Sequence, residues 1–239
     1  MSVSDRQVWQ TFVQLADTLT ADFDVIDFLH TLAQHSVDLL EVSACGILLA
    51  DHTGHLNLMA ASTEQVRLLE RFQVQAVEGP CVDAYRTRAP VSCPDLAADR
   101  ERWPTFTADA LSAGFTAVHA LPMRLRGDAI GAMSLYSTQS PGLSSQAAEL
   151  GQALADVATI GILHERAFRR KEMVAEQLQS ALRSRIMIEQ AKGVLAERLH
   201  ITVEDAFTLI RAYVRDHNLK LADTARAIIE GELRITLPE

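Results

Sequence analysis

The chain has 239 residues, of which 48% are hydrophobic and 22% are charged, and its net charge is −9 at neutral pH. These values are typical of a globular protein with one or two domains and a substantial apolar core. The sequence contains no run of about 18 apolar residues, and its start, MSVSDRQVWQ, lacks the basic and then apolar pattern of a signal peptide. We therefore expect a cytoplasmic protein that does not enter a membrane.

The net negative charge of the chain comes from its first two thirds. Residues 1–163 contain 9 basic and 19 acidic residues, whereas residues 164–239 contain 13 basic and 12 acidic ones. Nucleic-acid binding ordinarily depends on cations that neutralise phosphates. A nearly neutral C-terminal part would therefore bind RNA only through local groups of cationic side chains and through the shape of the RNA.

The first 72 residues predict two helices, a β-hairpin and a third helix. Apolar side chains recur at helical spacing over residues 4–20 and over about residues 24–40. The runs ACGILLAD and LNLMAAS then flank HTGH at residues 52–55, which is the pattern of a hairpin with glycine in its loop. A polar helical segment is expected at about residues 63–72.

A short strand at Val91–Cys93 and a second hairpin complete the predicted sheet. The two strands of this hairpin, FTAVHALPMRL and AIGAMSLYS, are separated by residues 126–128, with glycine in the middle. Pro122 in the first strand predicts a sheet edge or a bulge, because proline cannot donate a ladder hydrogen bond. Ser144 or Ser145 can cap the next helix. Helices beside antiparallel strands predict an α+β domain over residues 1–163.

Two blocks of this domain carry a family resemblance. The blocks are EGPCVDAYRTRAPVSCPDLAADRERWPTF and GFTAVHALPMRLRGDAIGAMSLY. In their order and separation they resemble a GAF domain, over roughly residues 20–163. The resemblance implies either a pocket for a small molecule, a haem or a metal on one side of the sheet, or a dimerisation unit without a ligand. It identifies no particular cofactor.

The three cysteines, Cys45, Cys81 and Cys93, are an odd number without a C-x-x-C pair, so neither a disulfide framework nor a zinc site is indicated. We interpret them as buried structural thiols. The alternative hypothesis is that Cys81 and Cys93 approach each other and act as a redox pair.

Three histidines are candidate ligands. His52 and His55 share a hairpin tip without a nearby cysteine or group of carboxylates, so we predict no metal site there. His119 lies in a predicted strand, where it is either a hydrogen-bonded core residue or a haem ligand facing the pocket.

Residues 145–199 contain no proline and predict one long helix. Apolar residues recur at seven-residue intervals, which is one seam position of a coiled coil, whereas the companion position is largely polar. The seam consists of Ile160, Ala167, Val174, Ala181, Ile188 and Leu195. We expect a helical linker at residues 164–183 and a homodimer with a weak seam, with packing inside one chain as the alternative.

Residues 184–233 predict three short amphipathic helices. Thr202 and Asp205 form a start signal for the second helix, and Asn218 is expected to end it. Gly231 is expected to close the third helix.

The segments IEQAKGVLAER, EDAFTLIRAYVRDHN and KLADTARAII resemble the ANTAR family of RNA-binding antitermination modules. The resemblance implies that residues 184–239 bind paired hairpins in nascent messenger RNA and thereby prevent a terminator from forming. No chemistry is required of these residues.

The polar residues of this module are the candidate RNA contacts, with cations on phosphates or guanine edges and a glutamine on a base edge. The alternative is a solvated surface paired internally with Glu189, Glu197 and Asp216. Gly193 would permit close approach of RNA or only tight helix packing. Phe207 is interpreted as a core residue. The candidate contacts are Arg185, Gln190, Lys192, Gly193, Arg198, Arg211 and Arg215.

Together the two resemblances imply a regulator in which a GAF domain senses a small molecule or a redox state and an ANTAR module binds RNA. The chain shows no nucleophile–base constellation, Walker loop or histidine-kinase block, so we do not expect an enzyme. The alternative is an accessory or phosphorelay protein that binds no RNA and whose C-terminal helices dock a protein partner.

Overall fold

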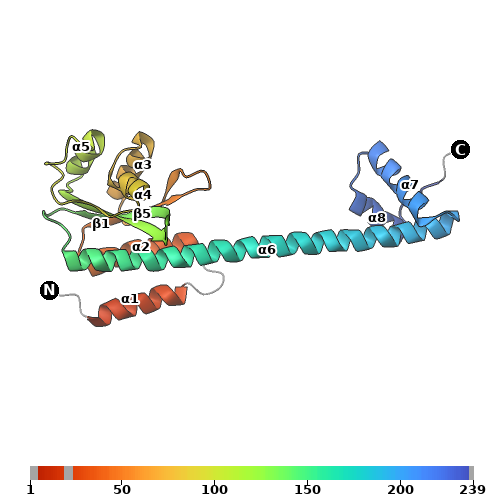
Figure 1. Ribbon diagram of the computed structural model, residues 1–239, viewed down its shortest axis with the longest axis horizontal. Helices are drawn as coiled ribbons and strands as arrows, with labels where there is room; N and C mark the ends of the chain where they lie inside the picture. Colours follow the sequence, from red (N-terminus) through yellow and green to blue (C-terminus); the bar gives the residue numbers. More distant parts are fainter. Residues whose placement is uncertain (1–4, 19–23, 237–239) are drawn as a thin grey trace. The chain divides into compact units, whose positions relative to one another are not determined.

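The computed structural model describes residues 5–18 and 24–236. The chain folds into two compact units, residues 1–166 and residues 167–239 (Figure 1). No helix in the described ranges is both long enough and apolar enough to cross a membrane.

The first unit is built on a five-stranded antiparallel sheet with the strand order β2-β1-β5-β4-β3. Both predicted hairpins, β1–β2 and β4–β5, pair as expected. The strands are β1 (Ala44–Ala50), β2 (Leu56–Ala61), β3 (Val91–Cys93), β4 (Ala117–Leu125) and β5 (Asp128–Ser137).

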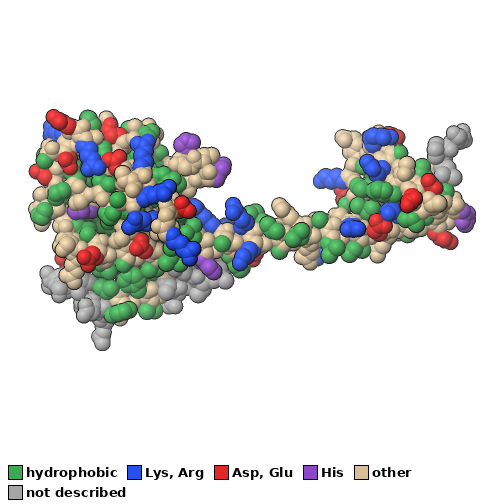
Figure 2. All heavy atoms as spheres, in the orientation of Figure 1, with side chains coloured by type: hydrophobic (Ala, Val, Ile, Leu, Met, Phe, Trp, Pro, Cys, Tyr) green, Lys and Arg blue, Asp and Glu red, His purple; other side chains and the backbone are tan. Residues whose placement is uncertain are grey.

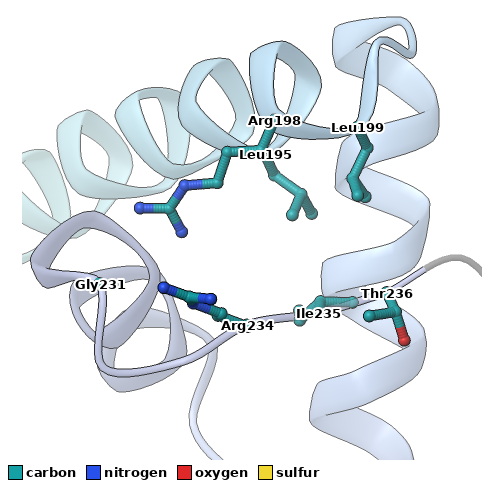
Figure 3. A pocket seen from close by; sticks show the side chains of 7 residues that line it. All are labelled: Leu195, Arg198, Leu199, Gly231, Arg234, Ile235 and Thr236. Carbon is teal, nitrogen blue, oxygen red and sulfur yellow. The ribbon is translucent and has the colours of Figure 1, made fainter.

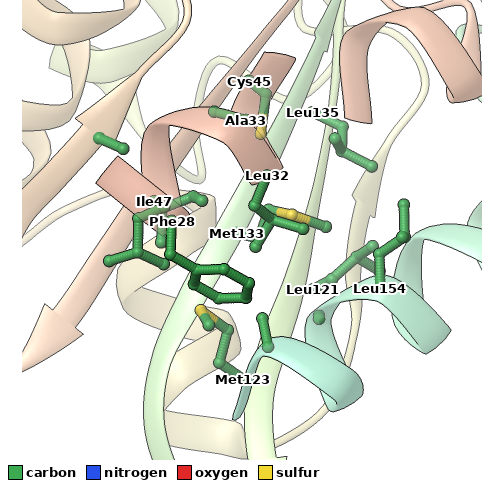
Figure 4. Packing of buried hydrophobic residues seen from close by; sticks show 14 of the residues in the cluster. Phe28, Leu32, Ala33, Cys45, Ile47, Leu121, Met123, Met133, Leu135 and Leu154 are labelled. Atoms are coloured by element: carbon green, nitrogen blue, oxygen red, sulfur yellow. The ribbon is translucent and has the colours of Figure 1, made fainter. Parts of the chain in front are cut away.

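Helices cover both faces of the sheet (Figure 1). One face packs against α2 and the first turns of α6 in an apolar core, with α1 adding Leu15 to it (Figure 4). The other face packs against α3, α4 and α5 in a second core. The five helices before the last strands are α1 (Asp5–Thr18), α2 (Val25–Leu40), α3 (Glu64–Ala76), α4 (Pro80–Thr87) and α5 (Pro104–Ser112).

Local signals placed α1, α2 and α3, whereas α4 and α5 were not predicted from the sequence. The first predicted helix, residues 4–20, corresponds to α1, and residues 4, 19 and 20 lie outside the described ranges. Asp24 caps α2 and Thr63 caps α3, each by accepting hydrogen bonds from backbone N–H groups of the first turn. The expectation for Pro122 is confirmed as an edge position, because β3 pairs only with residues 118–120 of β4. The bulge lies one residue beyond it, between Met123 and Arg124.

The long predicted helix is confirmed as α6 (Ser145–Leu199), a continuous helix of 55 residues that belongs to both units. Ser144 caps it, because its Oγ accepts a hydrogen bond from the backbone N–H of Ala147 at 3.2 Å. Its N-terminal turns bury Leu154 and Ile162 against the sheet.

The second unit packs the end of α6 against α7 (Val203–Asp216) and α8 (Leu221–Glu230) in a third apolar core. Thr202 caps α7 by accepting from the backbone N–H of Asp205 at 3.1 Å, as predicted. Helix α7 ends at Asp216, and Asn218 follows it in the left-handed region with φ 51°. Gly231 closes α8 with φ 81°.

Candidate RNA interface and sensor interior

The five candidate RNA contacts on α6 do not share one face of the helix. Arg185 and Lys192 are seven residues apart and lie on the same side, because a helix turns by about 100° per residue. Arg198 follows Lys192 by six residues and therefore lies about 120° away from it. Gln190 and Gly193 are both exposed. The sequence predicted one set of contacts, and the helix distributes them over several directions.

Helices α6 and α7 bring Lys192 and Arg211 together around the ring of Phe207. Lys192 Nζ lies 5.2 Å from the ring centroid, and Arg211 Cζ lies 5.8 Å from it. The ring is half-buried, so it is neither fully in the core nor free in solvent. Arg215 is one turn beyond Arg211 on the same side of α7. We name Lys192, Phe207 and Arg211 the Phe207 cluster.

Some of the candidate cations are paired within the chain. Lys192 Nζ lies 2.8 Å from Glu189 Oε2, and its side chain is 16% exposed. Arg215 Nε lies 3.4 Å from Asp216 Oδ1, with both side chains in solvent, where such a pair contributes little. No carboxylate within the described ranges forms an ion pair with Arg185, Arg198 or Arg211. The internal pairing that the sequence left open therefore applies to two of the five cations.

Gly193 has open space beside it. A Cβ atom at this position would meet no atom of another part of the described chain within 4 Å. Packing against α7 or α8 therefore does not require glycine here. This leaves close approach of RNA as the interpretation of Gly193, in place of tight helix packing.

A hydrogen-bonded network of buried polar side chains lies inside the first unit, between the sheet and helices α3 and α4. Its members are fully buried. Ser134 and Tyr136 on β5 both donate from their hydroxyl groups to Glu70 Oε1, in the case of Tyr136 at 3.0 Å. Gln73 Nε2 donates to Glu70 Oε2 at 3.0 Å and to Tyr136 Oη at 3.1 Å.

Cys81 joins this network from the first turn of α4. Its backbone N–H donates to Gln73 Oε1 at 3.1 Å, and its Sγ lies 2.7 Å from Ser134 Oγ. We name Glu70, Gln73, Cys81, Ser134 and Tyr136 the polar cluster. Burial raises the pKa of Glu70 to about 7, although its hydrogen bonds from Ser134 and Tyr136 act in the opposite direction. Near neutral pH, both protonation states of this carboxyl group are therefore populated.

Comparison with known families agrees with this arrangement. Residues 24–163 match the GAF domain, which is more than half of the chain, and residues 176–229 match the ANTAR domain. The chain belongs to the GAF domain family. Because an ANTAR domain follows, the protein has the GAF–ANTAR architecture, which supports a role as a sensor-regulator in RNA-binding antitermination.

The GAF fold is also found in solved structures. The GAF domain of a phosphoenolpyruvate-protein phosphotransferase from Coxiella burnetii is 17% identical with a TM-score of 0.54, covering 70% of this chain and 99% of that one. The corresponding domain from Acinetobacter is 18% identical with a TM-score of 0.53, covering 70% and 99%. Free methionine-R-sulfoxide reductase from Neisseria meningitidis, solved with its substrate, is 17% identical with a TM-score of 0.53, covering 70% and 96%. At these identities the likeness shows the fold alone. No curated protein gives a significant match.

The cysteines of the GAF domain are free and buried. Burial raises the pKa of Cys93 to about 12 and raises the pKa of Cys81 well above its ordinary value. Because the thiolate is the reactive form, these raised pKa values disfavour reaction of both thiols in the folded domain. The redox pair of Cys81 and Cys93 stays a prediction, and the burial of both thiols argues against it.

Two of the candidate histidines, His55 and His119, have hydrogen-bond partners. His119 Nε2 accepts from the backbone N–H of Leu143 at 3.3 Å, and burial lowers the pKa of His119. His55 Nδ1 lies 2.6 Å from Thr53 Oγ1. Within the described ranges, no three metal-binding side chains gather as a metal site would require. His119 therefore has the contacts of a core histidine.

Sequence reasoning missed most of the polar cluster. A signal was present, because Val66, Glu70 and Gln73 recur at helical spacing and therefore share a side of α3. That side is buried, with Val66 at 0% exposure, so a carboxylate on it was the unusual feature to notice. Ser134 and Tyr136 are two apart on β5 and so share a face of the sheet.

Proposed function

We propose that this protein binds paired RNA hairpins in nascent messenger RNA through its ANTAR domain and so prevents formation of a terminator, under the control of a signal that the GAF domain senses. The observation that carries the proposal is the Phe207 cluster. Two cations from different helices converge there on one aromatic ring, in a domain whose family acts on RNA.

The Phe207 cluster has the chemistry for structured RNA. Lys192 and Arg211 neutralise phosphates, and the accessible part of the Phe207 ring offers a surface for an unstacked loop base. The ion pair between Lys192 and Glu189 does not prevent this, because Glu189 is exposed and can release the ammonium group to a phosphate. Arg215, one turn away, extends the cationic surface along α7.

A gel-shift assay with two-hairpin RNA tests this function. We expect salt-sensitive binding by the full chain and a loss of about ten-fold or more in affinity for Lys192→Ala plus Arg211→Ala, because two charge-assisted contacts are removed. The matched control is Lys171→Ala plus Arg183→Ala, which removes the same charge from exposed positions of α6. Circular dichroism verifies that helicity is kept in both variants.

Equal loss in the test and control variants would mean that net charge alone drives binding, and would count against the Phe207 cluster. No RNA binding by the unmodified chain would overturn the proposed function and favour the alternative in which the C-terminal helices dock a protein.

Two ANTAR domains held in one dimer would engage two hairpins at once, and α6 carries a surface suited to pairing two chains. An apolar row at four-residue spacing is 49–66% exposed, which is costly for such side chains in water. Figure 2 shows apolar side chains along the middle of this helix. The row consists of Val174, Leu178, Leu182 and Ile186. We propose that a second copy of α6 covers it.

The three-helix core takes up the C-terminal end of the predicted coiled-coil seam. Leu195 is 1% exposed in the core of its own unit, and Ile188 packs against that core. Neither side chain is available to a second chain, whereas Val174 is. The intermolecular contact therefore lies N-terminal to the three-helix core.

For the sensing step we propose the polar cluster of the GAF domain. It presents a carboxyl group, an amide, two hydroxyl groups and a thiol inside one domain, and these groups could exchange their mutual hydrogen bonds for those of a small polar ligand. Native mass spectrometry of the purified protein measures subunit number and any retained small molecule together. A retained ligand that is lost in Gln73→Leu would support this location.

The redox branch of the sensing hypothesis has its own test. If Cys81 and Cys93 form a disulfide, both thiols lose their protons and two electrons pass to an added oxidant such as hydrogen peroxide, which is reduced to water. Titration after denaturation would then find one free thiol in place of three. An unchanged count of three after oxidant treatment would remove redox sensing by these cysteines.

A further inference from the structure

The ANTAR unit contains a second candidate contact, on a different side of α6 from the Phe207 cluster. A pocket of about 430 Å³ lies between the last turns of α6 and the segment that follows α8 (Figure 3). Its lining residues are Leu195, Arg198, Leu199, Gly231, Arg234, Ile235 and Thr236. The volume falls in the range of small-molecule sites, which is roughly 300–1,000 Å³.

The pocket has a cationic side and an apolar side. Figure 3 shows the side chains of Arg198 and Arg234 extending to the same open side, one from α6 and one from the segment after α8. The apolar side consists of Leu195, Leu199 and Ile235, of which Leu195 and Ile235 are buried in the domain core. This combination is suited to a ligand with an anionic end and a flat apolar end.

The two arginines lack acidic partners. Neither Arg198 nor Arg234 forms an ion pair or a side-chain hydrogen bond with any residue of the described chain. Glu197, Glu230 and Glu232 are near in sequence, and the structure pairs none of them with these guanidinium groups. Two like charges at one opening repel each other, so an anion bound between them is stabilised by both.

The position of Arg198 has a structural cause. One of its terminal nitrogens lies 3.9 Å from the position that a Cβ atom on Gly231 would occupy, so the guanidinium group is at the C-terminal end of α8. The partial negative charge of a helix C-terminus favours a cation there. This accounts for Arg198 but leaves Arg234, beyond the end of α8, without a structural role.

We propose that this pocket binds one nucleotide of the RNA, with the phosphate on Arg198 and Arg234 and the base against Leu199, at the edge of the core to which Leu195 and Ile235 belong. Guanidinium groups bind phosphate bidentately, and loop nucleotides that leave the stack are the usual targets of sequence-specific RNA recognition. The inference rests on the proposed function and adds a second contact, about 120° around α6 from Lys192.

The first experiment tests the pocket without hairpin RNA. Isothermal titration of the full chain with AMP, GMP, CMP, UMP and inorganic phosphate is expected to show at least one nucleotide bound about ten-fold more tightly than phosphate, because only the nucleotide reaches the apolar side. Arg234→Gln should weaken that nucleotide about ten-fold, and Arg234→Lys should have an intermediate effect because it keeps the charge without the bidentate geometry.

The second experiment uses two-hairpin RNA at several salt concentrations. Arg198→Gln plus Arg234→Gln should lower the affinity about ten-fold or more and reduce the salt dependence by about two phosphate contacts. The matched control is Arg183→Gln plus Arg226→Gln, which removes two charges from exposed residues that do not line the pocket, and it should change both quantities less. Unchanged thermal unfolding of the variants shows that the fold is kept.

The outcomes separate the inference from the proposed function. RNA binding that is lost in the variants of the Phe207 cluster but unchanged in the double arginine variant, with no nucleotide binding, would overturn the pocket and leave the function intact. Nucleotide binding without binding of hairpin RNA would assign the pocket to a free nucleotide and overturn its assignment to RNA. Loss of both in the double arginine variant supports the inference.

Discussion

Glu70 is a carboxylic acid in an environment where carboxylic acids are rarely found. Its carboxyl group is fully buried beneath the sheet, and three donors from Gln73, Ser134 and Tyr136 surround it without a cation. Burial disfavours the charged form, whereas the donors favour it, and the balance raises the pKa from 4.5 to about 7. The GAF domain therefore contains a proton-binding group that responds in the neutral range.

This pKa predicts a pH dependence of stability. In the window from about 4.5 to about 7, the folded state keeps a proton that the unfolded state has lost, so the free energy of unfolding falls as pH rises. One such group changes it by at most about 1.4 kcal/mol per pH unit. Glu70→Gln should remove this dependence, as measured by urea unfolding between pH 4.5 and 8.

The control is Glu149→Gln, which changes an exposed carboxylate of α6. Burial lowers the pKa of His119, so this residue makes the free energy of unfolding rise with pH, opposite to the effect of Glu70. The pH profile of Glu70→Gln is therefore compared with the profile of the unmodified chain, since both contain His119. Parallel pH profiles for Glu70→Gln and the unmodified chain would contradict the raised pKa of Glu70.

Substitution of Gly193 by alanine should change both the free energy of unfolding and the affinity for RNA. Gly193→Ala should raise the free energy of unfolding by about 0.5–1 kcal/mol, because alanine favours the helix and its Cβ meets nothing in the described chain. Affinity for two-hairpin RNA should fall if RNA lies close to this face. Thermal unfolding and gel shift measure the two effects, and a loss of stability would show that the face is occupied.

At the scale of elements, the cap at the N-terminus of α7 stabilises the three-helix core. Thr202 Oγ1 accepts from the N–H of Asp205 and itself donates to Asp205 Oδ2 at 2.7 Å. The helix that begins here carries Phe207 and Arg211, so this cap also positions the proposed RNA contact. Without it, the first turn of α7 would leave backbone donors unpaired.

Thr202→Ala should therefore destabilise the ANTAR unit by about 1 kcal/mol. Thr208→Ala is the control, since Thr208 is exposed in the middle of the same helix and donates only to the carbonyl of Glu204. There the same substitution should be neutral or slightly stabilising, because alanine has the higher helix propensity. Chemical unfolding followed by circular dichroism distinguishes the two, and equal effects would argue against a capping role.

At the scale of the whole molecule, the exposed apolar row on α6 predicts the oligomeric state. Leu178→Glu plus Leu182→Glu should convert a dimer into a monomer, because it places four like charges at the proposed contact. Affinity for two-hairpin RNA should fall more than affinity for a single hairpin, since only a dimer engages both hairpins at once. Sedimentation velocity and gel shift measure these effects.

The matched control places the same charges on the opposite side of the helix, with Ser180→Glu plus Ser184→Glu. Residues 180 and 184 lie about 200° around the helix from residues 178 and 182. A monomeric unmodified chain at micromolar concentration would rule out the proposed dimer, and dissociation by both pairs of substitutions would mean that charge alone separates the chains.

Local patterns in the sequence determined where most of the helices and strands lie. Helical and alternating spacing of apolar residues placed both hairpins and helices α1, α2, α7 and α8, and the absence of proline determined the continuous helix α6, which includes the first of the three predicted C-terminal helices. Helices α4 and α5 were not predicted. These features depend on residues close together in the chain. The boundaries assigned to the linker, residues 164–183, stay a prediction.

Only the tertiary structure decided which polar side chains meet. Glu70, Cys81 and Ser134 come from three elements, and no local spacing specifies their contact. Likewise, the packing of α7 and α8 on α6 buries Leu195 out of the predicted seam and brings Arg234 beside Arg198. Such contacts join residues far apart in sequence, so they follow from how the elements pack and not from the period of any one of them.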